Sequence, residues 1–230
     1  MTIRLSPKKA FALRLAFGAL VLITAAWLFG SIAEDVVNRD APLGTIDLAV
    51  SAWLHAHATP ARTSAMIFIS QLGAPLTASA IAVVVALFLL WRRQRYRLLA
   101  LVLAVPGGSL VNVVVKQVIH RHRPVFSDPI QTLTSYSFPS GHALGATVLY
   151  GMIAAMLVWR VDDWRLRALA ASAAFALIVL ISFSRIYLGL HYLSDVIAGF
   201  LEGVVWLGVC LAAVTALRNR RTRANERTSA

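Results

Sequence analysis

The chain alternates long apolar runs with short polar connections, a pattern that predicts membrane-spanning helices. Measured between charged residues, five runs approach or exceed spanning length: Leu15–Ala33, Thr63–Trp91, Leu98–Val115, Ala143–Trp159 and Ala168–Ser184. A sixth run, Val196–Leu217, is interrupted only by Glu202. A bilayer core needs about 20 apolar residues, and the shorter runs can extend through snorkelling arginines. The sequence therefore predicts one all-α, polytopic domain over residues 1–230, a bundle of six transmembrane helices.

Composition supports this interpretation. Hydrophobic residues make up 59% of the chain and charged residues only 14%, whereas soluble domains are about 25% charged. Lys8 and Lys9 precede the first apolar run as they would in a signal peptide, but the run is long for one, and we expect it to be retained. Cys210 has no possible intramolecular disulfide partner, and we expect it to fill apolar space in the sixth run.

The net charge of +12 at first suggests a nucleic-acid partner, but its distribution indicates a membrane. Sixteen of the 22 lysines and arginines fall in four segments: the N-terminus up to Arg14, the Trp91–Arg97 connection, the Arg160–Arg167 connection and the tail over 218–230. Six spans place all four on one side, which the positive-inside rule makes cytoplasmic. We expect a bacterial inner-membrane protein with both termini in the cytoplasm. No aromatic-interleaved basic surface indicates binding of nucleic acid.

The odd-numbered connections then face the periplasm or outside. In the first, residues 34–62, a group of side chains recurs at helical spacing: Ile46, Ala49, Val50, Trp53, Leu54 and His57. Either an interfacial amphipathic helix or a plain loop fits this segment. The second connection covers 116–142, with Pro139 expected to open the fourth helix. The third, near Ser184–His191, is short.

Polar residues inside or at the end of a span are costly and indicate function. Lys116 and Arg123 are seven residues apart, so both point the same way if the third helix continues; either alone is commonly a snorkelling anchor. Ser140, Gly141 and His142 open the fourth helix, whose free N–H groups favour an anion. Ser140 can cap the helix or bond a phosphate oxygen, and Gly141 permits close approach. A simple cap with an interfacial histidine is the alternative.

The third polar cluster contains Arg185, His191 and Asp195. His191 and Asp195 are four residues apart and are expected on one helix face. The carboxylate can accept the ring N–H and leave the other nitrogen as a nucleophile. Arg185 offers a forked donor for phosphate. A hydrogen-bonded pair without chemistry is the alternative, but all three clusters fall on the outer side, where together they predict a phosphate cradle with two histidines.

The three clusters resemble the signature motifs of the type-2 phosphatidic acid phosphatase superfamily. The motifs here are Lys116 with Arg123-Pro124, then Pro139-Ser140-Gly141-His142, then Ser184-Arg185 with His191 and Asp195, all at matching spacing. The family includes bacterial phosphatidylglycerophosphate and undecaprenyl diphosphate phosphatases and vanadium haloperoxidases. The resemblance covers 116–195 by motif and nearly the whole chain by its six-helix layout.

The resemblance also implies the roles of single residues. His191 attacks phosphorus, Asp195 orients it, and His142 protonates the leaving oxygen and then activates water. Binding of the phosphate falls to Lys116, Arg123, Ser140, Gly141 and Arg185. For this chain the resemblance implies a phosphatase that needs no metal or other cofactor. The implied activity is hydrolysis of a lipid phosphate or diphosphate: undecaprenyl diphosphate, phosphatidylglycerophosphate or phosphatidic acid.

Three other functions are compatible with parts of the pattern. A lipid-to-lipid phosphotransferase would use the same residues, a haloperoxidase would share the motifs but resembles soluble proteins, and a transporter would spread its charges along a path. The remaining histidines predict no metal site: His55 and His57 are expected at the surface, and His120 and His122 alternate with arginines that repel cations. Glu202 is expected to pair inside the bundle.

Overall fold

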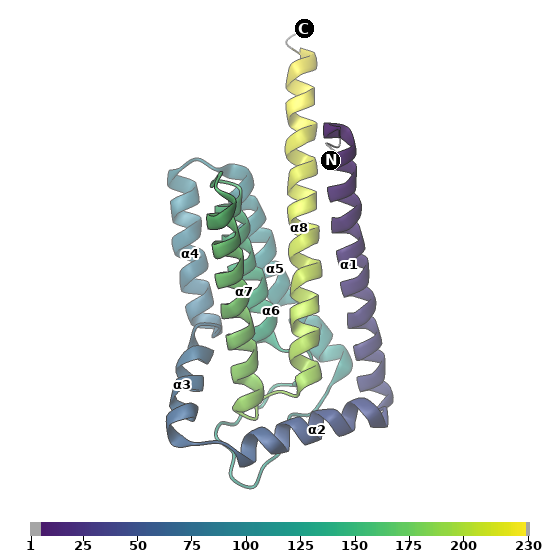
Figure 1. Ribbon diagram of the computed structural model, residues 1–230, viewed down its shortest axis with the longest axis vertical. Helices are drawn as coiled ribbons and strands as arrows, with labels where there is room; N and C mark the ends of the chain where they lie inside the picture. Colours follow the sequence, from purple (N-terminus) through teal and green to yellow (C-terminus); the bar gives the residue numbers. More distant parts are fainter. Residues whose placement is uncertain (1–5, 229–230) are drawn as a thin grey trace, which may run out of the picture.

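The computed structural model describes residues 6–228, which form eight α-helices and no strand (Figure 1). In chain order these are α1 (Pro7–Asn38), α2 (Ala41–Ala56), α3 (Pro60–Gln71), α4 (Pro75–Trp91), α5 (Arg95–Ile119), α6 (Gly141–Val158), α7 (Trp164–Tyr187) and α8 (Leu193–Thr228). Arg4 of the basic N-terminus and residues 229–230 of the tail lie outside the described residues. The rest of the expected tail continues α8 as helix.

Five of these helices, α1, α5, α6, α7 and α8, are each long and apolar enough to cross a membrane. The second predicted span, Thr63–Trp91, is a pair of helices, α3 and α4, bent by 42° at a short break. Pro75 explains the break, since proline has no N–H to donate and disfavours helix in the residue before it. Tyr150 of α6 donates to the Leu72 carbonyl at 2.8 Å and so satisfies an exposed backbone group. Five of the predicted spans are continuous helices, and α3 and α4 supply the sixth when they are counted as one broken span, the second in chain order.

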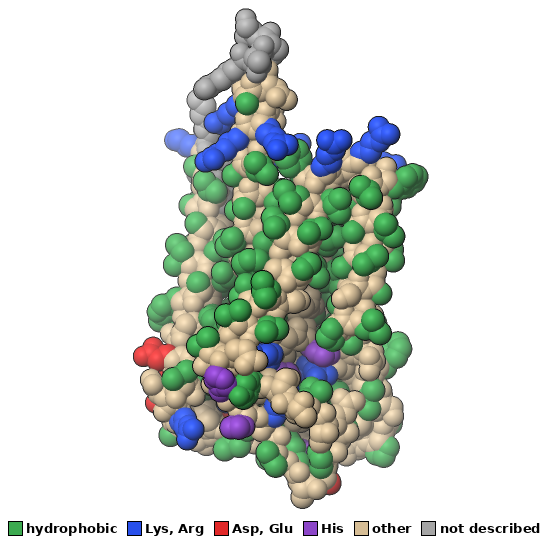
Figure 2. All heavy atoms as spheres, turned by 180° about the vertical axis from the view of Figure 1, so that it is seen from behind, with side chains coloured by type: hydrophobic (Ala, Val, Ile, Leu, Met, Phe, Trp, Pro, Cys, Tyr) green, Lys and Arg blue, Asp and Glu red, His purple; other side chains and the backbone are tan. Residues whose placement is uncertain are grey.

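The outer surface of the bundle is apolar along most of its length (Figure 2). Large side chains such as Phe17, Trp27 and Leu76 are 67%, 67% and 84% exposed. A water-soluble protein does not show so continuous an apolar surface, whereas a bilayer requires one. The chain is therefore a multi-span membrane protein.

Helix α6 is the centre of the bundle and packs against α5, α7 and α8. Close approach of α8 depends on two glycines: a Cβ at Gly199 would lie 2.4 Å from the Ser140 carbonyl oxygen, and one at Gly203 would lie 2.7 Å from the Thr147 Cβ. Small residues at such contacts let two membrane helices come together. This packing brings the N-terminal ends of α6 and α8 side by side.

The two ends of the bundle differ. Helix α1 begins and α8 ends at one end, together with the α4–α5 and α6–α7 connections (Figure 1). Figure 2 shows lysines and arginines concentrated there and histidines at the opposite end. Across that opposite end lies α2, which confirms a helix in the first long connection; its Trp53 is 60% exposed.

Candidate active site

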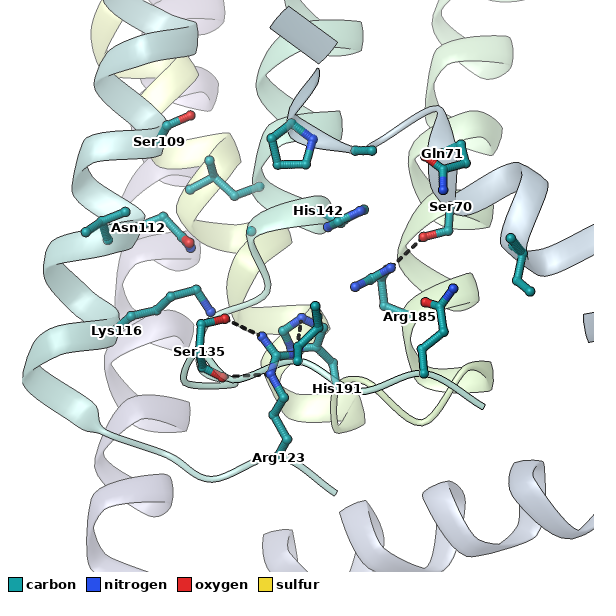
Figure 3. Close-up of a pocket in the computed structure, with 18 residues that line it drawn as sticks. Ser70, Gln71, Ser109, Asn112, Lys116, Arg123, Ser135, His142, Arg185 and His191 are labelled. Atoms are coloured by element: carbon teal, nitrogen blue, oxygen red, sulfur yellow. Dashed lines mark hydrogen bonds between the residues drawn. The ribbon is translucent and has the colours of Figure 1, made fainter. Parts of the chain in front are cut away.

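A cavity of about 660 Å³ opens at the histidine-rich end of the bundle. Six of the eight residues predicted for the site line it: Lys116, Arg123, Gly141, His142, Arg185 and His191. The remaining two, Ser140 and Asp195, are fully buried directly behind it. Three segments distant in sequence thus converge on one cavity, as the charge pattern predicted (Figure 3).

Several hydrogen bonds hold Arg123 at one end of the cavity. Its Nε and Nη2 donate to Ser135, at 2.7 Å to the carbonyl and 3.0 Å to the hydroxyl, and its Nη1 donates to the Leu190 carbonyl at 2.5 Å. The expected helical continuation from Lys116 to Arg123 is wrong, because α5 ends at Ile119 and His120 adopts a left-handed conformation. A loop, not a helix face, brings Arg123 towards Lys116.

The other two cations enter from helices on opposite sides of the cavity. Lys116, in the last turn of α5, donates to the carbonyls of Tyr136 and Ser137 at 2.8 and 3.2 Å. Arg185, 4% exposed in the last turn of α7, donates to the Ser70 hydroxyl at 2.6 Å. Among the described residues neither cation forms an ion pair with a carboxylate, so their charge can serve an anion in the cavity.

His191 has one nitrogen towards the cavity and one towards Asp195. Its Nε2 lies 3.2 Å from Arg123 Nη1 and can only accept there, so the ring proton is assigned to Nδ1. Nδ1 lies 3.4 Å from Asp195 Oδ2, a long contact that forms no well-aligned hydrogen bond. His191 precedes α8, which begins at Leu193, so the two residues meet across a helix start and not along a helix face.

The protonation state of His191 suits attack by its cavity-facing nitrogen. Burial lowers the pKa of His191 to about 4, against the opposing effect of the Asp195 carboxylate. The imidazole is therefore neutral at pH 7, and the lone pair of its Nε2 faces the cavity, where it accepts from Arg123 Nη1. A neutral, oriented imidazole is what nucleophilic catalysis requires.

His142 lies in the first turn of α6, across the cavity from His191 (Figure 3). The expectation that Pro139 opens this helix is wrong: α6 begins at Gly141, and Pro139 precedes the cap with a cis peptide bond after Phe138. Ser140 is the cap, its hydroxyl accepting from the Ala143 N–H at 3.5 Å. Of the two roles considered for Ser140, the structure shows the cap.

Arg121 forms a network behind the site that sequence reasoning missed. Its Nη1 donates to Asp195 Oδ1 at 2.6 Å and its Nη2 to Asp47 Oδ2 at 2.7 Å. Asp47, from α2, also accepts from the Ser194 N–H at 2.9 Å and from the Ser194 hydroxyl. The guanidinium stacks over the Tyr192 ring at 4.4 Å. The only sign of this network in the sequence was Asp47, an acidic residue within the helical repeat of residues 34–62.

Asn112 of α5 is a second residue that sequence reasoning missed. It is 4% exposed, lines the cavity, and donates to Glu202 Oε2 at 3.0 Å. The pairing expected for Glu202 is confirmed. The sequence did contain a sign that Asn112 is functional, because it places an amide inside the third apolar run, where polar groups are costly.

The remaining histidines lie outside the cavity. His55 is half-buried, not free at the surface: it bonds Asp128 at 2.9 Å and stacks on Phe126, so α2 is tied to the loop after Arg123. His57 is exposed as expected. Within residues 6–228, no three histidine, cysteine, aspartate or glutamate side chains are placed to hold a metal. Cys210 is buried, as expected.

Residues 97–219, which include all three motifs, match the sequence profile of the PAP2 superfamily. The chain belongs to the PAP2 superfamily. It is 30% identical to phosphatidylglycerophosphatase B of Bacillus subtilis over 180 residues, 78% of this chain and 88% of that protein. It is 37% identical to an undecaprenyl-diphosphatase of Sulfolobus acidocaldarius over 125 residues, 52% of this chain and 56% of that protein.

The fold gives the same assignment. The crystal structure of a transmembrane PAP2-type phosphatidylglycerolphosphate phosphatase from Bacillus subtilis superposes with a TM-score of 0.76 at 27% identity. The match covers 86% of this chain and 96% of that one. The chain is thus a membrane-spanning PAP2 protein of a lipid phosphatase family.

Proposed function

We propose that this PAP2 protein hydrolyses the terminal phosphate of a membrane lipid through a phosphohistidine intermediate, without a metal. The observation that supports it is the convergence of three cations, Lys116, Arg123 and Arg185, on a cavity shared by two histidines. The substrates considered are phosphatidylglycerophosphate and undecaprenyl diphosphate, in line with the names of the relatives, and phosphatidic acid.

In the first step, His191 Nε2 attacks phosphorus while the bond from phosphorus to the leaving oxygen breaks. His142 donates a proton to that oxygen, and the lipid leaves as an alcohol or a monophosphate. The three cations and the N-terminus of α6 stabilise the charge on the equatorial oxygens. The phosphate must displace Arg123 from its contact with Nε2, which turns this guanidinium towards the transferring group.

In the second step, water attacks phosphorus and the bond to Nε2 breaks. His142, now neutral, takes the proton from water, and inorganic phosphate is released. Asp195 stabilises the imidazolium character that His191 acquires when its Nε2 is phosphorylated. Because Arg121 shares Asp195 Oδ1, it fixes the carboxylate that faces Nδ1.

A phosphate-release panel in detergent tests the activity. Purified protein would be given phosphatidylglycerophosphate, undecaprenyl diphosphate, phosphatidic acid and a phosphorylated lipid A. We expect release from at least one of them, undiminished in excess chelator and inhibited by vanadate, which mimics the five-coordinate phosphoryl group. Activity lost in chelator and restored by one divalent ion would overturn the metal-free mechanism.

We further propose that the basic end of the bundle is cytoplasmic and that the cavity faces the outside of a bacterial inner membrane. Single cysteines at Ser127 and Gln94, in a Cys210→Ala background, test this orientation. An impermeant thiol reagent should label Ser127→Cys in intact cells and Gln94→Cys only after permeabilisation. The reverse labelling pattern would invert the topology.

A further inference from the structure

Asn112 presents a fixed hydrogen-bond acceptor to the cavity. Its amide nitrogen donates to Glu202 Oε2 at 3.0 Å and to the Pro139 carbonyl at 3.4 Å. The Pro139 carbonyl can only accept, so the NH₂ group must lie on that side and the amide oxygen on the other. Within residues 6–228, no donor bonds to Asn112 Oδ1.

Glu202 holds this orientation from behind. It is 6% exposed, comes from α8 and does not line the cavity. Its Oε1 has no hydrogen-bond partner among the described residues, so the bond to Asn112 is its principal polar contact. A buried carboxylate and amide in a membrane span are costly, and a pair retained there indicates a function.

Asn112 Oδ1 faces the place where the leaving group must lie. A Cβ at Gly141 would come within 3.2 Å of this oxygen, so Oδ1 lies over the start of α6, beside His142. Figure 3 shows Arg123 and His191 at one end of the cavity, with Asn112 level with His142 and Ser109 beyond them. A group that His142 protonates therefore lies within reach of Asn112.

Ser109 and Asn112 line the part of the cavity beyond His142, together with Val113 and Leu144. Lys116 lies one helical turn from Asn112, on the side towards Arg123. A second phosphate in the part beyond His142 would face the Asn112 oxygen, with the Glu202 carboxylate behind it. An acceptor in that position repels another acceptor and selects a donor.

We propose that Asn112, oriented by Glu202, is a specificity residue that accepts a hydrogen bond from a hydroxyl of the leaving group. The substrate class is a phosphate monoester of a glycerol whose neighbouring carbon carries a free hydroxyl, as in phosphatidylglycerophosphate. A diphosphate, whose leaving group offers a second phosphate in place of a hydroxyl, is disfavoured. This inference rests on the proposed function and narrows its choice of lipid.

The test compares phosphatidylglycerophosphate with its 2-deoxy analogue, which lacks only that hydroxyl. For the native protein we expect kcat/KM to be about 10-fold higher for the hydroxylated lipid, the size of one hydrogen bond. In Asn112→Leu, similar in shape but without an acceptor, the ratio should fall to one. Glu202→Gln keeps an acceptor for the amide and should keep the ratio, whereas Glu202→Leu should reduce it.

Thr147→Val is the matched control. Thr147 is a buried polar residue of α6 whose hydroxyl donates to its own helix at the Ala143 carbonyl, so its variant should keep the 10-fold ratio. A native ratio near one, or a ratio unchanged in Asn112→Leu, would overturn the subsite while leaving the phosphatase intact. If the native protein hydrolyses no lipid phosphate in the panel, the proposed function itself fails.

Discussion

The two ends of the bundle carry arginines in different physical states. At the basic end, Arg92 and Arg220 are exposed and extend into the surroundings. At the cavity end, Arg123 is part-buried and bonds three carbonyls and a hydroxyl, and Arg185 is 4% exposed. The same residue type is therefore exposed at one end of the bundle and held by hydrogen bonds at the other, where we propose that it binds phosphate.

The two kinds of arginine differ in when the side chain loses its conformational freedom. An exposed arginine keeps its water and its side-chain freedom, so its loss changes little. A buried one is ordered before any ligand arrives, and binding of an anion then costs less in lost freedom. Substitutions at the two ends should therefore have very different effects, and the predictions below test that contrast.

The largest effect is expected at His191. His191→Ala removes the nucleophile and should lower kcat by at least about 10⁵-fold and abolish the phosphoenzyme. His142→Ala should slow both steps but still form phosphoenzyme from nitrophenyl phosphate, whose leaving group needs little protonation. Acid-free quenching with labelled substrate measures the intermediate. If only His191→Ala forms it, the roles of the two histidines are reversed.

Asp195→Asn should have the next largest effect. An amide cannot stabilise the developing imidazolium, and a loss in kcat of about 10²–10⁴-fold matches comparable roles. Asp195 is buried and bonded to Arg121, so thermal unfolding of the variant should be measured alongside its rate. A folded variant with native kcat would exclude Asp195 from the mechanism.

Arg121→Gln tests the network that links α2 to the site. It removes the charge that holds Asp195 and Asp47 together, and kcat should fall about 10–100-fold, the range for residues that orient a catalytic group. KM should change much less, because Arg121 does not line the main cavity. Arg220→Gln at the basic end is the matched control and should keep kcat within about 2-fold. Equal losses in both variants would contradict the contrast between the ends.

The smallest effect concerns pH and stability. The pKa of His191 is lowered to about 4 by burial, so between its ordinary value and pH 4 the unfolded chain binds more protons than the folded protein. The free energy of unfolding should therefore fall as pH is lowered through this window and be unaffected by His191 above it. Thermal unfolding in detergent at pH 7 and pH 4.5 measures the fall.

His191→Gln is the control for the pH effect, since glutamine stays neutral throughout. The decrease in Tm between the two pH values should be smaller in this variant. An identical decrease in both proteins would show that other groups account for it.

The sequence predicted most of the fold because a membrane span leaves a strong local signal. Five of the six apolar runs appear as single helices, and the second run appears as the bent pair α3 and α4. The polar exceptions at Lys116, His142 and Arg185 do converge on one cavity. The break before Pro75 was missed, because the run from Thr63 to Trp91 contains no charge to mark it.

Other features could not be predicted because they depend on pairings between distant segments. Arg121 bonds Asp47 and Asp195, each of which is 74 residues away from it in the sequence. No local sequence pattern around these three residues indicates that they are in contact. Likewise, the orientation of the Asn112 side chain depends on its hydrogen bond to Glu202, which lies on another helix. Local patterns show that a residue is polar in an apolar region, whereas its partner is set by packing.

A main-chain hydrogen bond links the two segments that carry His142 and His191, in addition to the packing of their helices. The Ser140 N–H, just before His142, donates to the Asp195 carbonyl at 2.9 Å, and Gly199 keeps the two helices in contact below it. When a bilayer is thinner or thicker than the protein's apolar band, helices tilt to match it. We expect such a tilt to move α6 and α8 together, which would keep the distance between His142 and His191 independent of the thickness of the host membrane.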